Sequence, residues 1–314
     1  MSSQNLTQSI LKTIAYFDIF DYPLTSFEVW KWQYKISDIR YKISETSHSL
    51  LAVINELEQL VAENKLQTQN GFYFLPGRTE IVKTRMQRYN IAEIKYKKAV
   101  SIIKFLSLIP YIKMIAVCNT LGYSNSRQQA DIDLFIITAK KRVWLARFYS
   151  VLFLKFLGLR PKGKKVKDKF CLSFFISEDK LNIKELTMGE NDVYFQFWLT
   201  QLVPIYNTDN MYEKFLEANN WLKSFLPNCI GFDPAQRRKV KNRFKLCKKV
   251  WAYTTFNIDE KAARLIQLLI LPKKLKELVN KDTRVILNDQ VLKFHDNDRR
   301  EIYRDLWQRK VSSL

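Results

Sequence analysis

The sequence predicts a mixed α+β protein, and three observations lead to that fold class. Helix-like apolar stripes followed by a hairpin signal fill the first quarter of the chain. Short apolar runs alternate with helical patterns in the middle, which is typical of a mixed sheet with flanking helices. The last quarter reads as basic and mostly helical. We therefore expect four regions, at residues 1–78, 79–110, 111–228 and 229–314.

The composition limits the classes of protein. With 314 residues the chain is long enough for two domains with a real core. Seven glycines are too few for a glycine-rich phosphate loop, and neither of the usual spacings occurs. The four cysteines lie far apart, which argues against a disulfide framework. No signal peptide and no uninterrupted apolar run of about 20 residues is found, so we expect a cytoplasmic protein.

The charge predicts an anionic partner. The formal net charge is +21, and residues 229–314 hold 21 Lys or Arg against 10 Asp or Glu. Such a field attracts nucleotides, nucleic acid or anionic lipid, although a solvated basic surface is the alternative interpretation. The densest segments, 160–169 and 237–249, are candidates to hold a triphosphate or a polyanionic acceptor such as RNA. Charged residues interrupt the apolar segments, and we favour these partners over a membrane surface.

The first region reads as three helices and a hairpin. Thr25 and Glu28 have the spacing of a capping box, which satisfies free backbone donors where the second helix begins. A third helix is expected from about Ser49. The Asn70-Gly71 pair lies between two short extended runs, a strong hairpin signal. This order resembles a winged helix-turn-helix domain.

The third helix does not read as a DNA-binding element. Its expected exposed residues include Glu56, Glu58 and Glu63, and its first basic residue, Lys65, lies past its end. Reading a major groove usually needs arginine, lysine or amide side chains. We therefore expect a protein-interaction or packing module and argue against sequence-specific DNA binding.

The second region, 79–110, is expected to consist of basic connecting helices. In the third region, apolar composition predicts strands at 113–118, 131–138 and 170–177, a helix after the second strand, and an aromatic helical segment at 190–222. No internal repeat is visible in the chain.

Two carboxylates stand one residue apart at the start of the second strand of this region, in "ADIDLFII". Residues i and i+2 of a strand point to the same face, so Asp131 and Asp133 can hold one cation between them. Without a cation, two carboxylates this close resist ionising together. Magnesium suits such oxygen ligands, with phosphates completing its shell.

The stretch resembles the nucleotidyltransferase domain of the DNA polymerase β superfamily. In that family a Gly-Ser pair after one strand precedes Asp-x-Asp on the next, and Asn119-Thr120 stands here in place of Gly-Ser. The resemblance implies that Asp131 and Asp133 are the catalytic metal ligands. It implies nucleotide binding at Asn119, Thr120 and Ser124, and Mg²⁺-dependent transfer of a nucleoside monophosphate from an NTP to an acceptor hydroxyl.

Two features leave the activity open. Asn119 replaces a glycine of the family, and the strand "FCLSFFIS" at 170–177 holds no third carboxylate. The alternative to an active enzyme is therefore an inactive nucleotidyltransferase fold that binds nucleic acid or protein. The chain as a whole also resembles a bacterial group that joins a winged-helix amino terminus to such a domain, through "YFDIFDYPLT" and "GFYFLPGR".

Overall fold

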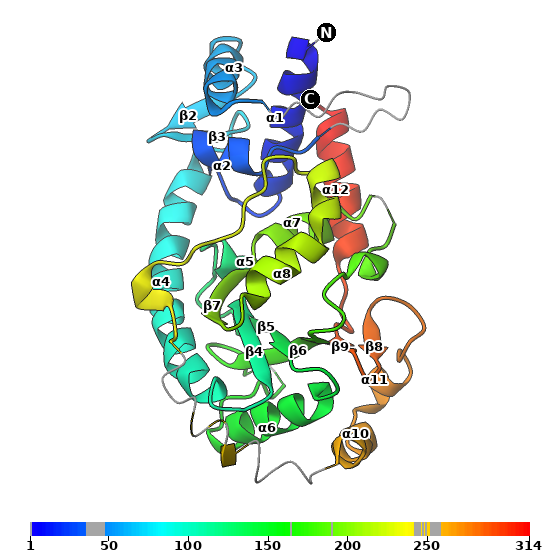
Figure 1. Cartoon of the computed structure of the whole chain (residues 1–314). Helices are drawn as coiled ribbons and strands as arrows, with labels where there is room; N and C mark the ends of the chain where they lie inside the picture. Colours follow the sequence, from blue (N-terminus) through cyan, green and yellow to red (C-terminus); the bar gives the residue numbers. More distant parts are fainter. Residues whose placement is uncertain are drawn as a thin grey trace.

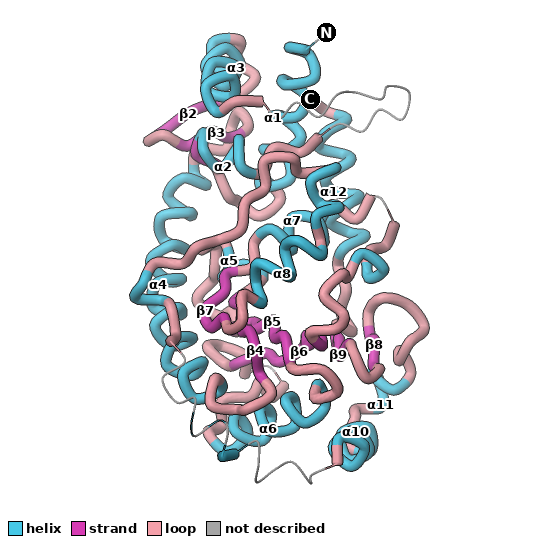
Figure 2. The backbone as a smooth tube through the Cα atoms, viewed as in Figure 1, coloured by secondary structure: helices cyan, strands magenta, loops and turns pink. Residues whose placement is uncertain are grey.

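A computed structural model of the protein describes residues 2–35, 48–163, 165–189, 191–241, 246, 248, 250–251 and 259–314. It confirms the expected mixed α+β class: helices surround one small and one larger sheet. Figures 1 and 2 show the larger sheet crossing the middle of the molecule, with helices on both of its sides. None of the helices in the described ranges is long and apolar enough to cross a bilayer.

The amino-terminal unit contains helices and a three-stranded antiparallel sheet in the order β1-β3-β2. The predicted capping box is present, because the Thr25 hydroxyl accepts from the Glu28 N–H at 3.3 Å and the Glu28 carboxylate accepts from the Thr25 N–H at 2.9 Å. The elements are α1 (Ser2–Asp18), β1 (Leu24–Thr25), α2 (Ser26–Lys31), α3 (Leu50–Ala62), β2 (Gln67–Gln69) and β3 (Phe72–Phe74).

The predicted start of the third helix and the predicted hairpin are confirmed, with one correction to the exposed residues of the helix. Ser49 caps α3 by accepting from the Ala52 N–H, and Asn70 and Gly71 take φ values of +53° and +75° in a two-residue turn. Glu56, expected to be exposed, is buried instead and accepts a hydrogen bond from Thr7 of α1. The exposed acidic residues in this part of the chain are therefore Glu58 in α3 and Glu63 directly after it.

One long helix, α4 (Glu80–Leu106), spans most of the second region, where we predicted connecting helices. Several of its cations are used inside the molecule. Both Nη atoms of Arg85 donate to the Glu28 carboxylate at 2.8 Å, and Arg88 donates to Asp21 at 3.0 Å. These ion pairs tie the amino-terminal unit to α4, so their charge is not offered to a polyanion.

The central sheet has six strands in the order β7-β4-β5-β6-β9-β8. All neighbours are antiparallel except β5 and β6, which run parallel with a helix between them in the chain. The elements are β4 (Ile112–Val117), α5 (Asn119–Gly122), β5 (Ile132–Thr138), α6 (Val143–Phe156), β6 (Phe170–Ser177), α7 (Val193–Thr200), β7 (Val203–Asn207) and α8 (Met211–Ala218), then α10 (Glu260–Leu269), α11 (Lys273–Lys276), β8 (Val285–Leu287), β9 (Val291–Phe294) and α12 (Arg300–Ser312).

Three strands depart from the sequence expectation. β7 lies in the segment expected to be wholly helical, and the β8–β9 hairpin lies in the carboxy-terminal region expected to be helical. These strands have three to five residues, and β7 contains Pro204, so none gives a periodic signal. β7 and β9 pair with the edges of the longer strands β4 and β6, and β8 pairs with β9.

The central strands are mostly apolar because both faces of the sheet are covered. Ile115 and Val117 of β4 pack in one cluster with residues of α4 and α6. Met114 and Ala116, the alternate residues, pack in another cluster with residues of α7 and α8. The sheet is therefore buried between two helical layers.

The two halves of the chain share a core through aromatic residues. Tyr16 of α1 stacks on Phe197 of α7 with ring centroids 4.0 Å apart. Trp307 of α12 donates to the Lys12 carbonyl at 3.0 Å, and Figure 1 shows α12 beside α1 with both chain ends at the same pole. Packing against the amino-terminal unit thus holds helix α7 in place.

Gly122 marks a close approach that any side chain would disrupt. A Cβ atom at this position would lie 2.4 Å from the Gln201 carbonyl oxygen, which belongs to the backbone. Gly122→Ala is therefore expected to lower the free energy of unfolding by about 1–3 kcal/mol, the usual cost of overpacking. Urea denaturation measures this change. The exposed Gln128→Ala variant is the control, and equal stability of the two variants would contradict the argument.

Candidate functional site

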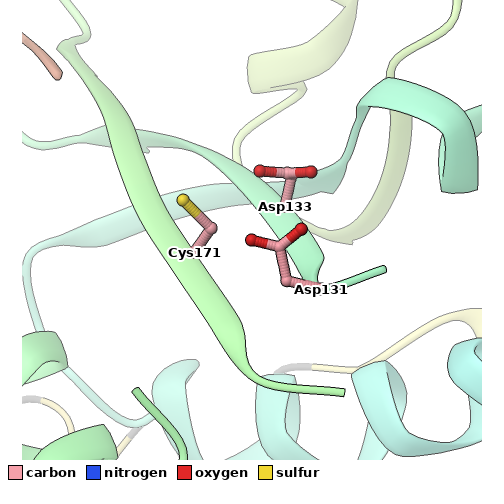
Figure 3. Close-up of side chains that lie close together, drawn as sticks. All are labelled: Asp131, Asp133 and Cys171. Carbon is pink, nitrogen blue, oxygen red and sulfur yellow. The ribbon is translucent and has the colours of Figure 1, made fainter. Parts of the chain in front are cut away.

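The two predicted carboxylates lie together at the start of β5. Asp131 immediately precedes the strand and Asp133 is its second residue. Their oxygens and the Sγ of Cys171 on β6 all lie within 4.8 Å of one another (Figure 3). Within the described part of the chain no other set of three His, Cys, Asp or Glu side chains is this close.

A pocket of about 550 Å³ opens onto this group. Its floor is the carboxylate pair with Cys171, one wall is the aromatic side of α7, and the other wall is the segment that joins β9 to α12. The lining residues that carry these walls are Tyr194, Phe195 and Trp198 from α7, and Lys293, His295, Arg299 and Tyr303 from the carboxy-terminal segment.

The ionisation of the pair depends on what lies between the two side chains. Burial and the neighbouring Asp131 carboxylate raise the pKa of Asp133 to about 7. Burial also raises the pKa of Asp131. The pair therefore favours a bound cation or a shared proton near neutral pH.

The basic residues near the pair are engaged elsewhere. Lys95 donates to the Ala130 carbonyl at 2.6 Å and to the Asp168 carboxylate at 2.7 Å. Arg160 donates to the Phe170 carbonyl at 3.0 Å. Burial raises the pKa of Asp131, and the positive charges of Lys95 and Arg160 partly oppose this shift. Among the described residues neither Asp131 nor Asp133 forms an ion pair. The space between the carboxylates is thus left for a ligand.

Asn119 takes the conformation that a glycine would favour at this place. Its φ is +54°, in the left-handed region that asparagine tolerates better than most residues. Its side-chain oxygen accepts from Trp198 Nε1 at 2.8 Å, and its amide hydrogen-bonds the Asp133 carboxylate, which holds down the pKa of Asp133. Asn119 therefore orients one member of the pair and links it to α7.

The other two predicted nucleotide-binding residues do not line the pocket. Thr120 is half-buried in α5, and its carbonyl accepts from the Asn125 N–H at 2.7 Å. Ser124 is half-buried with φ +60°, and its N–H donates to the Leu121 carbonyl. The structure therefore brings Asn119, Asp131 and Asp133 together and leaves these two residues outside the site.

Cys171, Ser173 and His295 belong to the pocket and were not among the predicted site residues. Ser173 Oγ and His295 Nε2 are 3.0 Å apart, and burial lowers the pKa of His295 to about 3, so its ring is neutral at pH 7. Cys171 could have been predicted from the sequence, because it lies on the strand where the resemblance implies a third carboxylate. For His295 the sequence shows only the neighbouring Asp296 and Asp298, and its place beside Ser173 depends on the pairing of β9 with β6.

The basic segments expected to bind polyanions are only partly described. Arg237 and Arg238 pair with Glu93 of α4, and Lys248 donates to the Ile112 carbonyl at 2.8 Å. Residues 242–245, 247 and 249 of the block 237–249 lie outside the described residues, as does residue 164 of the lysine-rich loop.

Comparison of the chain with known protein families, with curated proteins and with solved structures finds no match.

Proposed function

We propose that the protein is a metal-dependent nucleotidyltransferase that moves a nucleoside monophosphate from an NTP to an acceptor hydroxyl. The observation that carries the proposal is the Asp131–Asp133 pair, held within 4.8 Å at the floor of a pocket with no cation of the described chain bound to it. The succession β4, α5, β5, α6, β6, with the acidic pair at the start of β5, supports the nucleotidyltransferase resemblance.

Each wall of the pocket has a part in this function. Asp131 and Asp133 are the residues that would hold the cation, which when bound would neutralise charge on the transferred phosphoryl group. Asn119 orients Asp133 through its amide. The rings of Tyr194 and Tyr303 stack at 5.1 Å on the pocket wall and give a flat apolar surface for a base. Arg299 is exposed at the rim and supplies positive charge for phosphates.

Calorimetric titration of ATP, GTP, CTP and UTP with a divalent cation tests this function. Wild type is expected to bind at least one NTP, and Asp131→Ala/Asp133→Ala is expected to weaken that binding at least ~100-fold, because both cation ligands are gone. The matched control is Asp179→Ala/Asp209→Ala, which removes two exposed carboxylates outside the pocket. Identical heats for wild type and the Asp131/Asp133 variant would remove the proposed site.

The amino-terminal unit fits a winged helix whose role is protein contact. Its order α1, β1, α2, α3, β2, β3 and its β1-β3-β2 sheet support that assignment. The exposed face of α3 carries Glu58, and Glu63, which follows the helix, is paired with Lys65 at 2.7 Å. This face would repel DNA phosphates and suits a protein partner.

A second candidate is an inactive fold that binds nucleic acid or protein. It is favoured by the side chains that accompany Asp131 and Asp133. Among the described residues, the third potential ligand within 4.8 Å is the thiol of Cys171 and not a carboxylate. Salt-dependent gel shifts with RNA that are unchanged in Asp131→Ala/Asp133→Ala, with no turnover of any NTP, would favour this candidate. The described cysteines are free thiols, which suits a reducing cytoplasm as the place where the protein acts in either function.

A further inference from the structure

The third donor of the acidic site is a sulfur atom from the neighbouring strand. β5 and β6 run parallel, and Asp133 is directly paired in register with Cys171. Side chains at paired positions of adjacent strands point to the same face of the sheet. The Sγ of Cys171 therefore lies beside the two carboxylates, and Figure 3 shows the three side chains converging.

We propose that Cys171 is the third protein ligand of the cation held by Asp131 and Asp133, and that the site consequently selects a thiophilic divalent cation of the zinc type over Mg²⁺. The inference rests on the proposed function of the same site and names the cation that the site takes.

The chemistry of the donors supports this choice. Mg²⁺ demands oxygen ligands in near-ideal octahedral geometry, and a thiolate is not one of them. Zn²⁺ accepts sulfur and carboxylate oxygen together, and its catalytic sites combine three protein ligands with one open position. Asp131, Asp133 and Cys171 are three such ligands, and the pocket of about 550 Å³ leaves the open position accessible to a substrate.

The surroundings hold these ligands in place. The Asn119 amide hydrogen-bonds Asp133, and fixed outer partners of this kind orient metal ligands. Two other polar residues of the pocket, Ser173 and His295, are already joined, since Ser173 Oγ lies 3.0 Å from His295 Nε2. Ligation by the three converging side chains therefore leaves the Ser173–His295 pair intact.

The first experiment uses Co²⁺ as a spectroscopic substitute for Zn²⁺ with the full-length protein. Wild type is expected to show thiolate-to-cobalt charge transfer in the near ultraviolet, which Zn²⁺ displaces and Mg²⁺ does not. Cys171→Ser is expected to lose this band, whereas Cys229→Ser, which removes a half-buried cysteine outside the pocket, is expected to keep it. A wild-type cobalt spectrum without the band, or a band that survives in Cys171→Ser, would overturn the assignment.

The second experiment measures the preference by calorimetry. Wild type is expected to bind Zn²⁺ at least ~100-fold more tightly than Mg²⁺, and Cys171→Asp, with three carboxylates, is expected to narrow that ratio at least ~10-fold. If Cys171→Asp leaves the ratio of Zn²⁺ to Mg²⁺ affinity unchanged, the sulfur of Cys171 does not set the preference for Zn²⁺.

The variant Asp131→Asn/Asp133→Asn separates this inference from the proposed function. If it abolishes cation binding while Cys171→Ser does not alter it, the acidic site stands and only the zinc-type ligand set is wrong. If it leaves cation binding unchanged, the acidic site is not the cation site and both proposals fail.

Discussion

Arg300→Met is expected to lower the free energy of unfolding by about 3–5 kcal/mol. The Arg300 guanidinium lies 2.7 Å from the Asp192 carboxylate, with side-chain exposures of 5% and 0%. Asp192 also caps α7 by accepting from the Phe195 N–H at 3.1 Å. Removing the arginine leaves a buried carboxylate without its counter-charge, and this carboxylate secures the start of the helix that walls the pocket.

Urea denaturation monitored by circular dichroism measures this effect. The control on the same helix is Arg304→Met, whose partner Asp305 is half-exposed or more, and it should cost less than about 1 kcal/mol. Adding Asp192→Asn to Arg300→Met should restore part of the loss, because the buried charge is then removed. Equal effects of the Arg300 and Arg304 substitutions would contradict the structural role of this ion pair.

The second large effect expected is a pH dependence that arises from Asp133. Its folded-state pKa of about 7 lies well above the ordinary value of 3.8 for the unfolded chain. Between these values the folded protein keeps a proton that the unfolded chain has lost, so stability falls as pH rises from about 4 to about 7. Each pKa unit corresponds to about 1.4 kcal/mol, and we expect a loss of about 2–4 kcal/mol across this range.

The measurement compares wild type with Asp133→Asn in metal-free buffer at several pH values. Subtracting the two curves removes the opposite trend from His295, whose lowered pKa makes stability rise with pH between about 3 and 6.5. A divalent cation should recover wild-type stability at pH 8 and have little effect at pH 5, where protons compete for the carboxylates. Parallel curves for wild type and Asp133→Asn would show that Asp133 ionises normally.

Several local features could be predicted from the sequence because neighbouring residues decide them. The Thr25–Glu28 capping box and the Asn70-Gly71 turn depend on backbone donors and φ angles within four residues. The central strands β4, β5 and β6 could be predicted because both faces of the sheet are buried, which makes their sequences mostly apolar. The closeness of Asp131 and Asp133 follows from the two-residue period of a strand.

The sequence by itself thus determined the α+β class, the principal strands and the acidic pair. Only the tertiary structure decided that Cys171 stands beside that pair, because the register between β5 and β6 brings together residues 38 positions apart. It also decided that Arg85 and Arg88 serve ion pairs within the molecule, and that the segment after β9 closes the pocket. Such contacts are selected by packing and pairing between distant segments, for which a single sequence carries no periodic signal.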